Sequence, residues 1–434
     1  MNKAGQALAP RLARGLYSLL LRAATPLYFA RLWWRGRAEP PYRQHWAERL
    51  GAGGDGITGR LWLHAVSLGE TRAATPLIEA LRRSAPGLQL LLTHGTATGR
   101  DAGAELLRPG DAQVWLPYDT PGAARRFLRR HRPRVGVLME TELWPNLIEQ
   151  ARRTGVPLVL ASARLSERSQ RKGERLAALM RPAVQGLSLV LAQTEADAQR
   201  LRQSGAGPVR VLGNLKFDLQ PDAAQLARGA QWRERIGRAV VLGAVTREGE
   251  EAALLQAWRH TAEPRPLLVL VPRHPQRFDE VAGLVTAAGF TLQRRSAWGE
   301  EPVPEAAAAD VWLGDSMREM ALYYGLADVA LLGGSFAPLG GQNLIEAAAC
   351  GCPLVMGPHT FNFQLAAELA ADAGAALRVA DMGAAVALAR SMLADGSAQR
   401  ASRQAHAFAA AHRGAAQQMA EQVLALDSVL QSRP

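Results

Sequence analysis

The 434-residue sequence predicts an α/β protein with two parallel sheets, and three observations support this fold class. Short, nearly continuous apolar runs alternate with longer helical segments, as in sheets that helices cover on both faces. A polar, alanine-rich stretch over residues 219–230 divides these runs into two series. The length fits two or three domains of ordinary size, and hydrophobic residues make up 48% of the chain, which is ample for packed cores.

The first series of apolar runs predicts the strands of an N-terminal domain over residues 36–218. Helix-like segments separate most of these runs, which is the pattern of a parallel sheet. The runs read LWLHAV, LQLLLT, QVWLPY, VGVLME, PLVLAS, LSLVLA and VRVLGN, and they start at residues 61, 88, 113, 135, 157, 187 and 209.

The second series predicts a C-terminal domain over residues 231–434, and residues 219–230 are predicted to be a linker. The runs read AVVLGAV, PLLVLVPR, VWLGD, VALLGG and CPLVMG, and they start at residues 239, 266, 311, 329 and 352. From Met382 onward the sequence is alanine-rich and predicts helices that belong to the same domain. Paired α/β halves of this kind bind ligands at the carboxyl ends of their strands.

The chain is strongly basic, with a net charge of +12 and a pI near 10.6. Basic proteins attract nucleic acid or anionic membranes, but no nucleic-acid-binding motif accompanies the basic runs, so we expect no nucleic-acid partner. Cys350 and Cys352 are too few and too close for a disulfide framework or a zinc site, and they fit a reducing compartment. No cluster has metal-ligand spacing, so we expect neither a metal nor a resident cofactor.

Residues 1–35 are predicted to form a membrane-anchoring or interfacial helix. The segment LYSLLLRAATPLYFARLWW, Leu16 to Trp34, is apolar and aromatic but contains Arg22 and Arg31. An arginine near the centre of a spanning helix costs about 2.5–3.5 kcal/mol, so both a spanning helix and a helix in the plane of the membrane surface remain open. The alternative is a helix packed on its own domain. A second basic run, residues 124–134, fits either lipid phosphates or a solvated helix face.

Charged groups follow several predicted strands. Glu70 ends HAVSLGE, Glu140 and Glu142 end LMETE, Lys216 lies in VLGNLKFD, and Arg273 lies in VPRHPQR. The chain has few lysines, so a retained one suggests a site that needs a compact ammonium group. Each residue also has a structural alternative. The first glutamate could favour a helix dipole, the other two could pair with arginines, the lysine could be a linker charge, and the arginine could cap a helix.

The segment GGQNLIEAAACGCP, residues 340–353, predicts a short helix with a glycine-rich entry. Asn343 and Glu346 have the spacing of a capping box, which would explain both without a ligand. The preceding glycines allow backbone N–H groups to approach an anion at a helix N-terminus, and a nearby carboxylate suits ribose hydroxyls. This second interpretation is a nucleotide site. Asp315, in WLGDSMREM, is expected to be the N-cap of the helix that follows it.

The ordered set of motifs RLWWRGRAEPPYRQHWAERLG, LWLHAVSLGE, METELWPN, GNLKFD, VPRHPQRF, GDSMREM and GGSFAPLGGQNLIEAAACGCPLVMGPHTFNF resembles the 3-deoxy-D-manno-octulosonic acid (Kdo) transferase family. The resemblance covers nearly the whole chain. It implies the GT-B glycosyltransferase fold, in which two Rossmann-like domains face a cleft. It also implies inverting transfer of Kdo from CMP-Kdo to a lipid A precursor, lipid IVA, on the cytoplasmic side of the bacterial inner membrane.

The resemblance assigns roles to residues of this chain. Glu70 matches the general base, and Glu140 or Glu142, of which we prefer the first, matches a residue that assists the transition state together with Lys216. The N-terminal domain then binds the acceptor and the C-terminal domain binds the donor. The segments that match the CMP site contain Pro272, Arg273, Met317, Arg318, Glu319, Asn343, Leu344, Ile345 and Glu346.

The implied partners are CMP-Kdo as a co-substrate, lipid IVA and an anionic membrane surface. Arg318 departs from the family pattern, which usually has glycine there. If backbone N–H groups of this segment hold CMP, the arginine is expected to adopt a negative φ. The alternative enzyme is a GT-B protein that uses a UDP-sugar, as a transferase or an epimerase. A non-catalytic basic scaffold at the membrane surface is a third alternative, which predicts no nucleotide binding.

Overall fold

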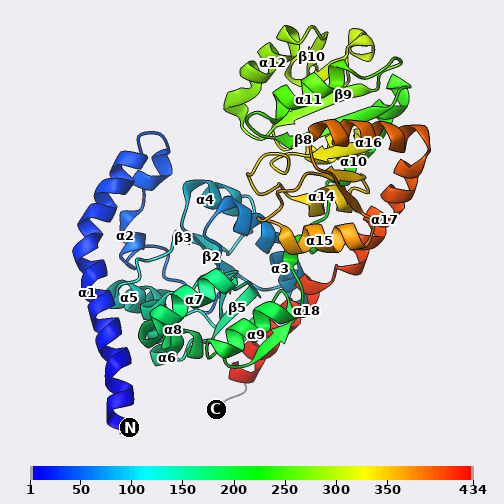
Figure 1. Ribbon diagram of the computed structural model, residues 1–434. Coiled ribbons are helices and arrows are strands. Elements are labelled where there is room, and N and C mark those ends of the chain that lie inside the picture. Colours follow the sequence, from blue (N-terminus) through cyan, green and yellow to red (C-terminus); the bar gives the residue numbers. More distant parts are fainter. Residues whose placement is uncertain (1–2, 432–434) are drawn as a thin grey trace. The chain divides into compact units, whose positions relative to one another are not determined.

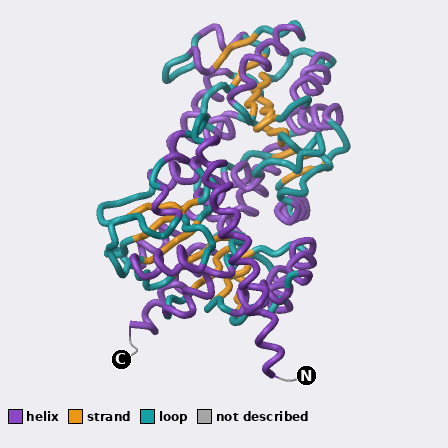
Figure 2. The backbone as a smooth tube through the Cα atoms, turned by 90° about the vertical axis from the view of Figure 1, so that its left-hand side faces the viewer, coloured by secondary structure: helices purple, strands orange, loops and turns teal. Residues whose placement is uncertain are grey.

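The computed structural model of the protein divides into two units. The structure describes the backbone of residues 3–431 and the side chains of residues 8–428. Within that range, unit 1 holds residues 3–218 and 414–431, and unit 2 holds residues 219–413. Each unit is built around one parallel sheet that is enclosed by helices, as Figure 2 shows, so the predicted α/β class is confirmed.

The sheet of unit 1 has seven parallel strands in the order β3-β2-β1-β4-β5-β6-β7. Apolar cores cover both of its faces, which is why its strands are almost continuously hydrophobic. The strands are β1 (Leu61–His64), β2 (Leu90–His94), β3 (Ala112–Trp115), β4 (Gly136–Met139), β5 (Leu158–Ala163), β6 (Leu189–Ala192) and β7 (Val209–Val211).

Helices connect the strands of unit 1 and cover its sheet. Several begin with a Ser or Thr N-cap, such as Ser67 and Thr96, whose side chain accepts a backbone N–H of the first turn. The helices are α1 (Lys3–Arg35), η1 (Pro40–Arg43), α2 (Trp46–Arg49), α3 (Leu68–Ser84), α4 (Ala97–Ala104), α5 (Pro121–His131), α6 (Pro145–Thr154), α7 (Glu167–Arg175), α8 (Ala177–Gln185), α9 (Glu195–Gln203), η2 (Leu215–Asp218) and α18 (Ala415–Gln431).

The last helix, α18, belongs to unit 1, so the assignment of residues 414–434 to the C-terminal domain is wrong for the residues described (Figure 1). Met419, Ala420 and Val423 of α18 are buried in the same core as residues of α3. The carboxylate of Asp218 accepts the N–H groups of Gly414 and Ala416 at 2.6 and 2.9 Å. These contacts fix the point at which the chain returns to unit 1.

The sheet of unit 2 also has seven parallel strands, in the order β10-β11-β9-β8-β12-β13-β14. Two of them, the edge strands β10 and β14, were not predicted, because their sequences, LQR and ALR, contain no apolar run. The strands are β8 (Val240–Thr246), β9 (Leu267–Pro272), β10 (Leu292–Arg294), β11 (Val311–Leu313), β12 (Val329–Leu332), β13 (Leu354–Met356) and β14 (Ala376–Arg378).

Most of the predicted linker is helical, because residues 223–230 form the first part of α10 (Ala223–Ile236). This helix packs closely on α13, where a Cβ atom at Gly229 would lie 2.1 Å from the carbonyl oxygen of Leu322. The segment is thus an integral part of unit 2. The other helices of unit 2 are α11 (Glu250–Arg259), η3 (Pro275–Arg277), α12 (Phe278–Ala287), η4 (Arg295–Ala297), η5 (Pro304–Ala308), α13 (Met320–Leu326), α14 (Leu344–Ala349), α15 (Gln364–Asp372), α16 (Met382–Ala394) and α17 (Ser397–Ala411).

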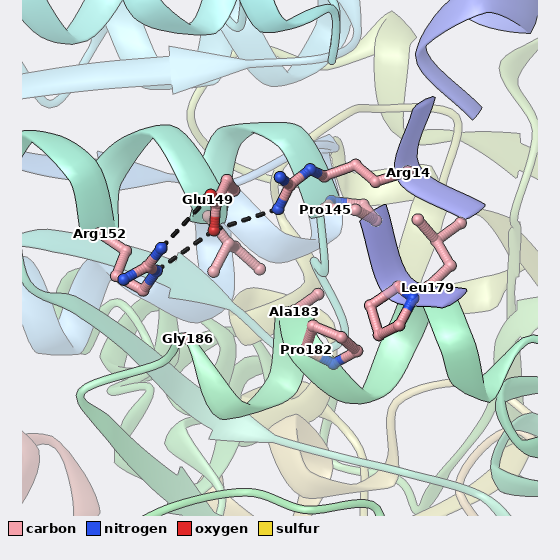
Figure 3. Close-up of a pocket in the computed structure, with 10 residues that line it drawn as sticks. Arg14, Pro145, Glu149, Arg152, Leu179, Pro182, Ala183 and Gly186 are labelled. Carbon is pink, nitrogen blue, oxygen red and sulfur yellow. Dashed lines mark hydrogen bonds and ion pairs between the residues drawn. The ribbon is translucent and has the colours of Figure 1, made fainter. Parts of the chain in front are cut away.

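Helix α1 packs on unit 1 through one face. Tyr17 donates to the buried carboxylate of Asp119 at 3.0 Å, and Ser18 donates to Asn146 at 3.1 Å. Arg14 lies 3.2 Å from Glu149, which also pairs with Arg152, at the edge of a hollow between α1, α6 and α8 (Figure 3). The residues predicted to bind substrate do not line this hollow. The alternative of a helix packed on its own domain is therefore confirmed for the face of α1 that carries Arg14, Tyr17 and Ser18.

The opposite face of α1 is apolar and exposed. Its large side chains are between 50% and 75% exposed, and they are Leu8, Leu12, Leu16, Leu19, Leu20, Leu27, Trp33 and Trp34. Within residues 3–431, no helix combines the length and the apolar character that crossing a bilayer requires. The second basic run forms α5, whose Phe127 and Leu128 are buried while its arginines are exposed.

Candidate active site

The strand order of the unit 1 sheet reverses between β1 and β4. The chain adds β2 and β3 on one side of β1, and β4 to β7 on the other side. At such a switch point the loops after the two strands separate and leave room for a ligand. Glu70 lies in the first turn of α3, directly after β1, and Glu140 and Glu142 directly follow β4. The three carboxylates that were predicted to act together, here called the carboxylate cluster, therefore lie at one point of the sheet.

Glu70 is held by the start of α3. Its Oε2 accepts the N–H of Val66 at 2.8 Å, and its own N–H donates to the Oγ of Ser67, the N-cap, at 3.4 Å. This reciprocal arrangement is close to a capping box. The structural alternative, in which Glu70 belongs to the start of a helix, is thus confirmed. The same contacts hold its carboxylate near Glu140 and Glu142.

The pKa of Glu70 is raised above its usual value. Burial is the main cause, and the N–H of Val66 opposes it. The charges of Glu142 and Glu140 raise the pKa further, whereas His64 lowers it. A carboxylate with a raised pKa is a stronger base, which is the property that a general base requires.

Glu140 pairs with Lys216, whose Nζ lies 3.3 Å from its Oε1. The two side chains are 19% and 23% exposed, so solvent screens the pair only in part. Glu140 has a φ of 55°, a left-handed conformation that is uncommon for a residue other than glycine and is frequent at functional sites. Lys216 lies in η2, between buried Leu215 and Phe217, so it is not a linker charge in solvent.

Glu142 lies near a residue that the sequence analysis did not single out. Its Oε2 is 3.8 Å from the Nε2 of His64, the last residue of β1, which is completely buried. The sequence does carry a signal for this histidine. It occupies the last position of a strand that leads directly to Glu70, where an otherwise apolar run would be expected to continue.

In unit 2, a buried carboxylate that sequence reasoning also missed organises the glycine-rich loop after β12. Glu250, in the first turn of α11, is 3% exposed. Its Oε2 accepts the N–H of Gly334 at 2.7 Å, and its Oε1 accepts those of Phe336 and Ala337 at 3.1 and 3.3 Å. Its Oε2 also accepts the N–H of Arg247 at 2.9 Å. One side chain thus joins the loops that follow β8 and β12, the switch point of this sheet.

The predicted helix after the glycines is α14. Asn343 is its N-cap, as predicted, and its side chain accepts the N–H of Ile345 at 3.2 Å. The side chains of Leu344 and Ile345 are buried in the core, so these two residues offer a ligand only their backbone. Glu346 is half-buried, and its charge adds to the effect of burial in raising the pKa of Cys350 to about 12.

The segment before α13 differs from two expectations. Arg318 has a φ of 66°, so the expectation of a negative φ is wrong, and this arginine takes a backbone conformation that usually favours glycine. Its carbonyl oxygen accepts a hydrogen bond from Gln225 at 2.9 Å, which ties the turn to α10. Asp315 is not an N-cap, since Glu319 occupies that position. Its carboxylate instead accepts hydrogen bonds from Ser296.

The other residues predicted to bind CMP lie in contrasting surroundings. Glu319 pairs with Arg228 and Arg295, each at 2.9 Å, whereas Met317 is 59% exposed. Pro272 ends β9, and Arg273 follows it with an exposed side chain. The N–H of Arg273 donates to the end of β8, which fixes its backbone but leaves its guanidinium at the surface. No group of His, Cys, Asp and Glu side chains in the described part of the chain is arranged to hold a metal ion.

Comparison with known proteins identifies the family. The sequence profile of 3-deoxy-D-manno-octulosonic-acid transferase (kdotransferase) matches residues 44–219. The 3-deoxy-D-manno-octulosonic acid transferase of Bordetella pertussis is 49% identical, over 93% of this chain and 97% of the relative. That of Haemophilus influenzae is 35% identical, over 81% of this chain and 83% of the relative.

A solved structure supports the fold. The crystal structure of a glycosyltransferase from Rickettsia africae matches with a TM-score of 0.58 and covers 86% of this chain and 100% of its own, at 11% identity. This likeness concerns the fold alone, and with the two Rossmann-like sheets it identifies the GT-B architecture. The sequence identities to the Bordetella and Haemophilus enzymes, together with the matching family profile, show that this chain belongs to the 3-deoxy-D-manno-octulosonic acid transferase family.

Proposed function

We propose that this enzyme transfers Kdo from CMP-Kdo to lipid IVA with inversion, and that Glu70 is the general base. The observation that carries this proposal is the gathering of the carboxylate cluster at the β1–β4 switch point, beside Lys216. Membership of the Kdo transferase family supports the sugar that is transferred. The donor nucleotide, the acceptor lipid and the stereochemistry are the parts that the proposal adds.

In the proposed reaction, an acceptor hydroxyl attacks the anomeric carbon of Kdo. A new C–O bond forms while the bond between that carbon and the phosphate oxygen of CMP breaks, and CMP leaves as an anion. The hydroxyl proton moves to Glu70, whose raised pKa suits it to receive the proton. Direct attack on the face opposite the leaving group inverts the configuration.

Glu140, Glu142 and Lys216 are proposed to assist the transition state. The ammonium group of Lys216 is held at 3.3 Å from Glu140 and so has a fixed position. A fixed cation stabilises negative charge that develops during reaction, with little reorganisation. The carboxylate of Kdo is one such charge, and the glutamates would favour positive charge on the sugar ring.

The donor site is proposed to lie on unit 2. Its components are Pro272, Arg273, Met317, Arg318, Glu319, Asn343, Leu344, Ile345 and Glu346. Arg273 has an exposed guanidinium, which suits a phosphate, and the half-buried Glu346 has a carboxylate that suits ribose hydroxyls. The side chain of Glu319 already pairs with two arginines, so its proposed role is to fix the backbone of the turn.

The enzyme is proposed to act without a metal or a resident cofactor, on the cytoplasmic side of the bacterial inner membrane. The exposed leucines and tryptophans of α1 suit a helix that lies in the membrane surface. Basic groups such as Arg22, Arg31 and Arg37 would add attraction to anionic lipids, at about 1 kcal/mol each.

The proposal is tested by incubating the enzyme with lipid IVA and freshly generated CMP-Kdo, followed by mass spectrometry of the lipid. The expected product is lipid IVA with added Kdo, and formation should continue in excess EDTA. A parallel thermal shift measurement compares CMP with UDP. Stabilisation by UDP alone, or the absence of a Kdo adduct, would overturn the proposal and favour the UDP-sugar alternative.

A further inference from the structure

The loop that carries Glu140 and Glu142 leaves the sheet at the end of β4. Its start is fixed by backbone hydrogen bonds. The N–H of Glu140 donates to the carbonyl oxygen of Ala161 in β5 at 2.9 Å, and the N–H of Glu142 donates to that of Met139 at 3.3 Å. The position of the two glutamates then depends on what holds the other end of the loop, where the chain enters α6.

Helix α6 has no cap of its own. Its N-cap, Trp144, makes no side-chain hydrogen bond to the helix, and Pro145 has no N–H. The first N–H groups that need an acceptor belong to Asn146 and Leu147. Both donate to the carboxylate of Asp119, at 3.1 and 2.7 Å, and the side-chain amide of Asn146 donates to the carbonyl oxygen of Asp119 at 2.6 Å. Asp119, from the segment between β3 and α5, therefore replaces the missing cap.

Helix α1 completes this arrangement. The hydroxyl of Tyr17 donates to Oδ2 of Asp119 at 3.0 Å, the same oxygen that accepts the N–H of Asn146. The hydroxyl of Ser18 lies 3.1 Å from Oδ1 of Asn146 and 2.7 Å from the carbonyl oxygen of Arg14, and so shares its proton between them. Asp119, Asn146 and Ser18 are all buried. A buried carboxylate that loses one of its donors is destabilised, so α1 stabilises the start of α6 through Asp119.

We propose that Tyr17 and Asp119 are positioning residues for the transfer reaction, through which α1 holds the loop of Glu140 and Glu142 in place. This inference rests on the proposed function, because it requires the two glutamates to assist transfer. Neither positioning residue forms a bond to substrate. They fix the downstream end of a loop whose upstream end the sheet already fixes, so that both carboxylates keep their places beside Glu70.

The coupling is tested directly by hydrogen exchange on the full-length protein, followed by mass spectrometry of peptides from the start of α6. In Tyr17→Phe the amides of Asn146 and Leu147 should exchange about tenfold faster, because a hydrogen bond to a charged group contributes at least that factor to an equilibrium constant. Tyr28→Phe is the matched control, since it alters an exposed tyrosine of the same helix, and exchange should not change. Peptides of β2 should stay protected in both variants. Unchanged exchange in Tyr17→Phe would overturn the inference, whatever the role of the glutamates.

The effect on catalysis is tested with CMP-Kdo and lipid IVA in detergent micelles, well below the melting temperature of each variant. Asp119→Asn replaces one acceptor oxygen by an NH₂ group that would face a backbone N–H. It should displace the start of α6 and lower kcat by about a hundredfold, the effect of a small misplacement. Tyr17→Phe keeps the carboxylate and should lower kcat by about tenfold. It provides the test if Asp119→Asn does not fold. CMP affinity, measured by calorimetry, should stay at the wild-type value in both variants, because the proposed donor site is on unit 2.

Variants of the loop itself separate this inference from the proposed function. If Glu140→Gln and Glu142→Gln lose turnover while Tyr17→Phe and Asp119→Asn keep the wild-type kcat, the positioning role is wrong and that of the glutamates stands. If Glu140→Gln and Glu142→Gln keep wild-type turnover, the glutamates do not assist transfer, and the link between α1 and catalysis falls with them. Faster exchange together with a lower kcat, at unchanged CMP affinity, is the result that the inference requires.

Discussion

The ammonium group of Lys216 lies 3.3 Å from the carboxylate of Glu140. Glu140 directly follows β4, whereas Lys216 lies in η2, at the end of residues 3–218 of unit 1. Only three lysines occur in the chain, so a lysine at this position suggests that the site requires a compact cation, and substitution of Lys216 tests this. Lys216→Gln should lower turnover by about 10²–10³-fold, the range found when one fixed stabilising group is removed. Turnover is measured with CMP-Kdo and lipid IVA.

Two further variants define the lysine requirement. Lys216→Arg should restore only part of the turnover, because the planar guanidinium cannot take the position of an ammonium group. Lys172→Gln is the control, since Lys172 is an exposed lysine of α7. Equal losses in the Lys172 and Lys216 variants, or full activity of Lys216→Gln, would exclude a specific role for Lys216.

Glu70→Gln should lower turnover by at least about a hundredfold, because a positioned general base contributes about 10²–10⁴-fold. Glutamine keeps the size of the side chain and can still accept the N–H of Val66, so the start of α3 should stay intact. Melting temperature and CMP affinity are measured alongside turnover, and both should remain near wild type. A low melting temperature with proportionate loss of activity would instead indicate that the capping contacts are the main role of Glu70.

Glu250→Ala should destabilise unit 2. The buried carboxylate accepts four backbone N–H groups, and each donor left without a partner costs about 1–3 kcal/mol, so a total loss of at least about 3 kcal/mol is expected. Denaturant unfolding, followed by probes in each unit, measures this loss. Glu248→Ala is the control, because its side chain is 53% exposed and should change stability by no more than about 0.5 kcal/mol. Equal stability of the two variants would contradict this account of the loop.

Glu346→Ala should weaken CMP binding by about 1.5–3 kcal/mol, the contribution of a hydrogen bond to a charged group. The measurement is calorimetric titration with CMP. Glu368→Ala, which removes an exposed acid of α15 in the same unit, should leave the affinity unchanged. If Glu346 only supports the start of α14, the affinity will be unchanged while the melting temperature falls.

Replacing two exposed leucines of α1, in the double variant Leu12→Ser and Leu16→Ser, should weaken binding to anionic vesicles without lowering stability. These side chains are 63% and 60% exposed, so the folded protein does not depend on them. Each would contribute up to about 1.5–3 kcal/mol if it became fully buried in lipid. Leu365→Ser, at an exposed leucine of unit 2, is the control. Binding should also fall as salt increases, and binding that is insensitive to both changes would exclude this face of α1.

The sequence by itself determined the fold class, most of the strands and the positions of the charged groups that follow them. It could do so because a strand buried on both faces must be almost wholly apolar, and a polar residue at its end is then conspicuous. Glu70, Glu140 and Glu142 were found in this way. The edge strands β10 and β14 were missed because their sequences, LQR and ALR, contain no run of apolar residues.

Only the tertiary structure decided which distant groups meet. The pairing of Lys216 with Glu140 depends on where η2 lies relative to β4, and the return of α18 to unit 1 depends on contacts with Asp218 and α3. Local sequence patterns cannot predict such contacts, because the contacts are formed by segments far apart in the chain. The contact between His64 and Glu142 is of the same kind, since the histidine acquires its significance only when the parallel pairing of β1 and β4 brings the two residues together.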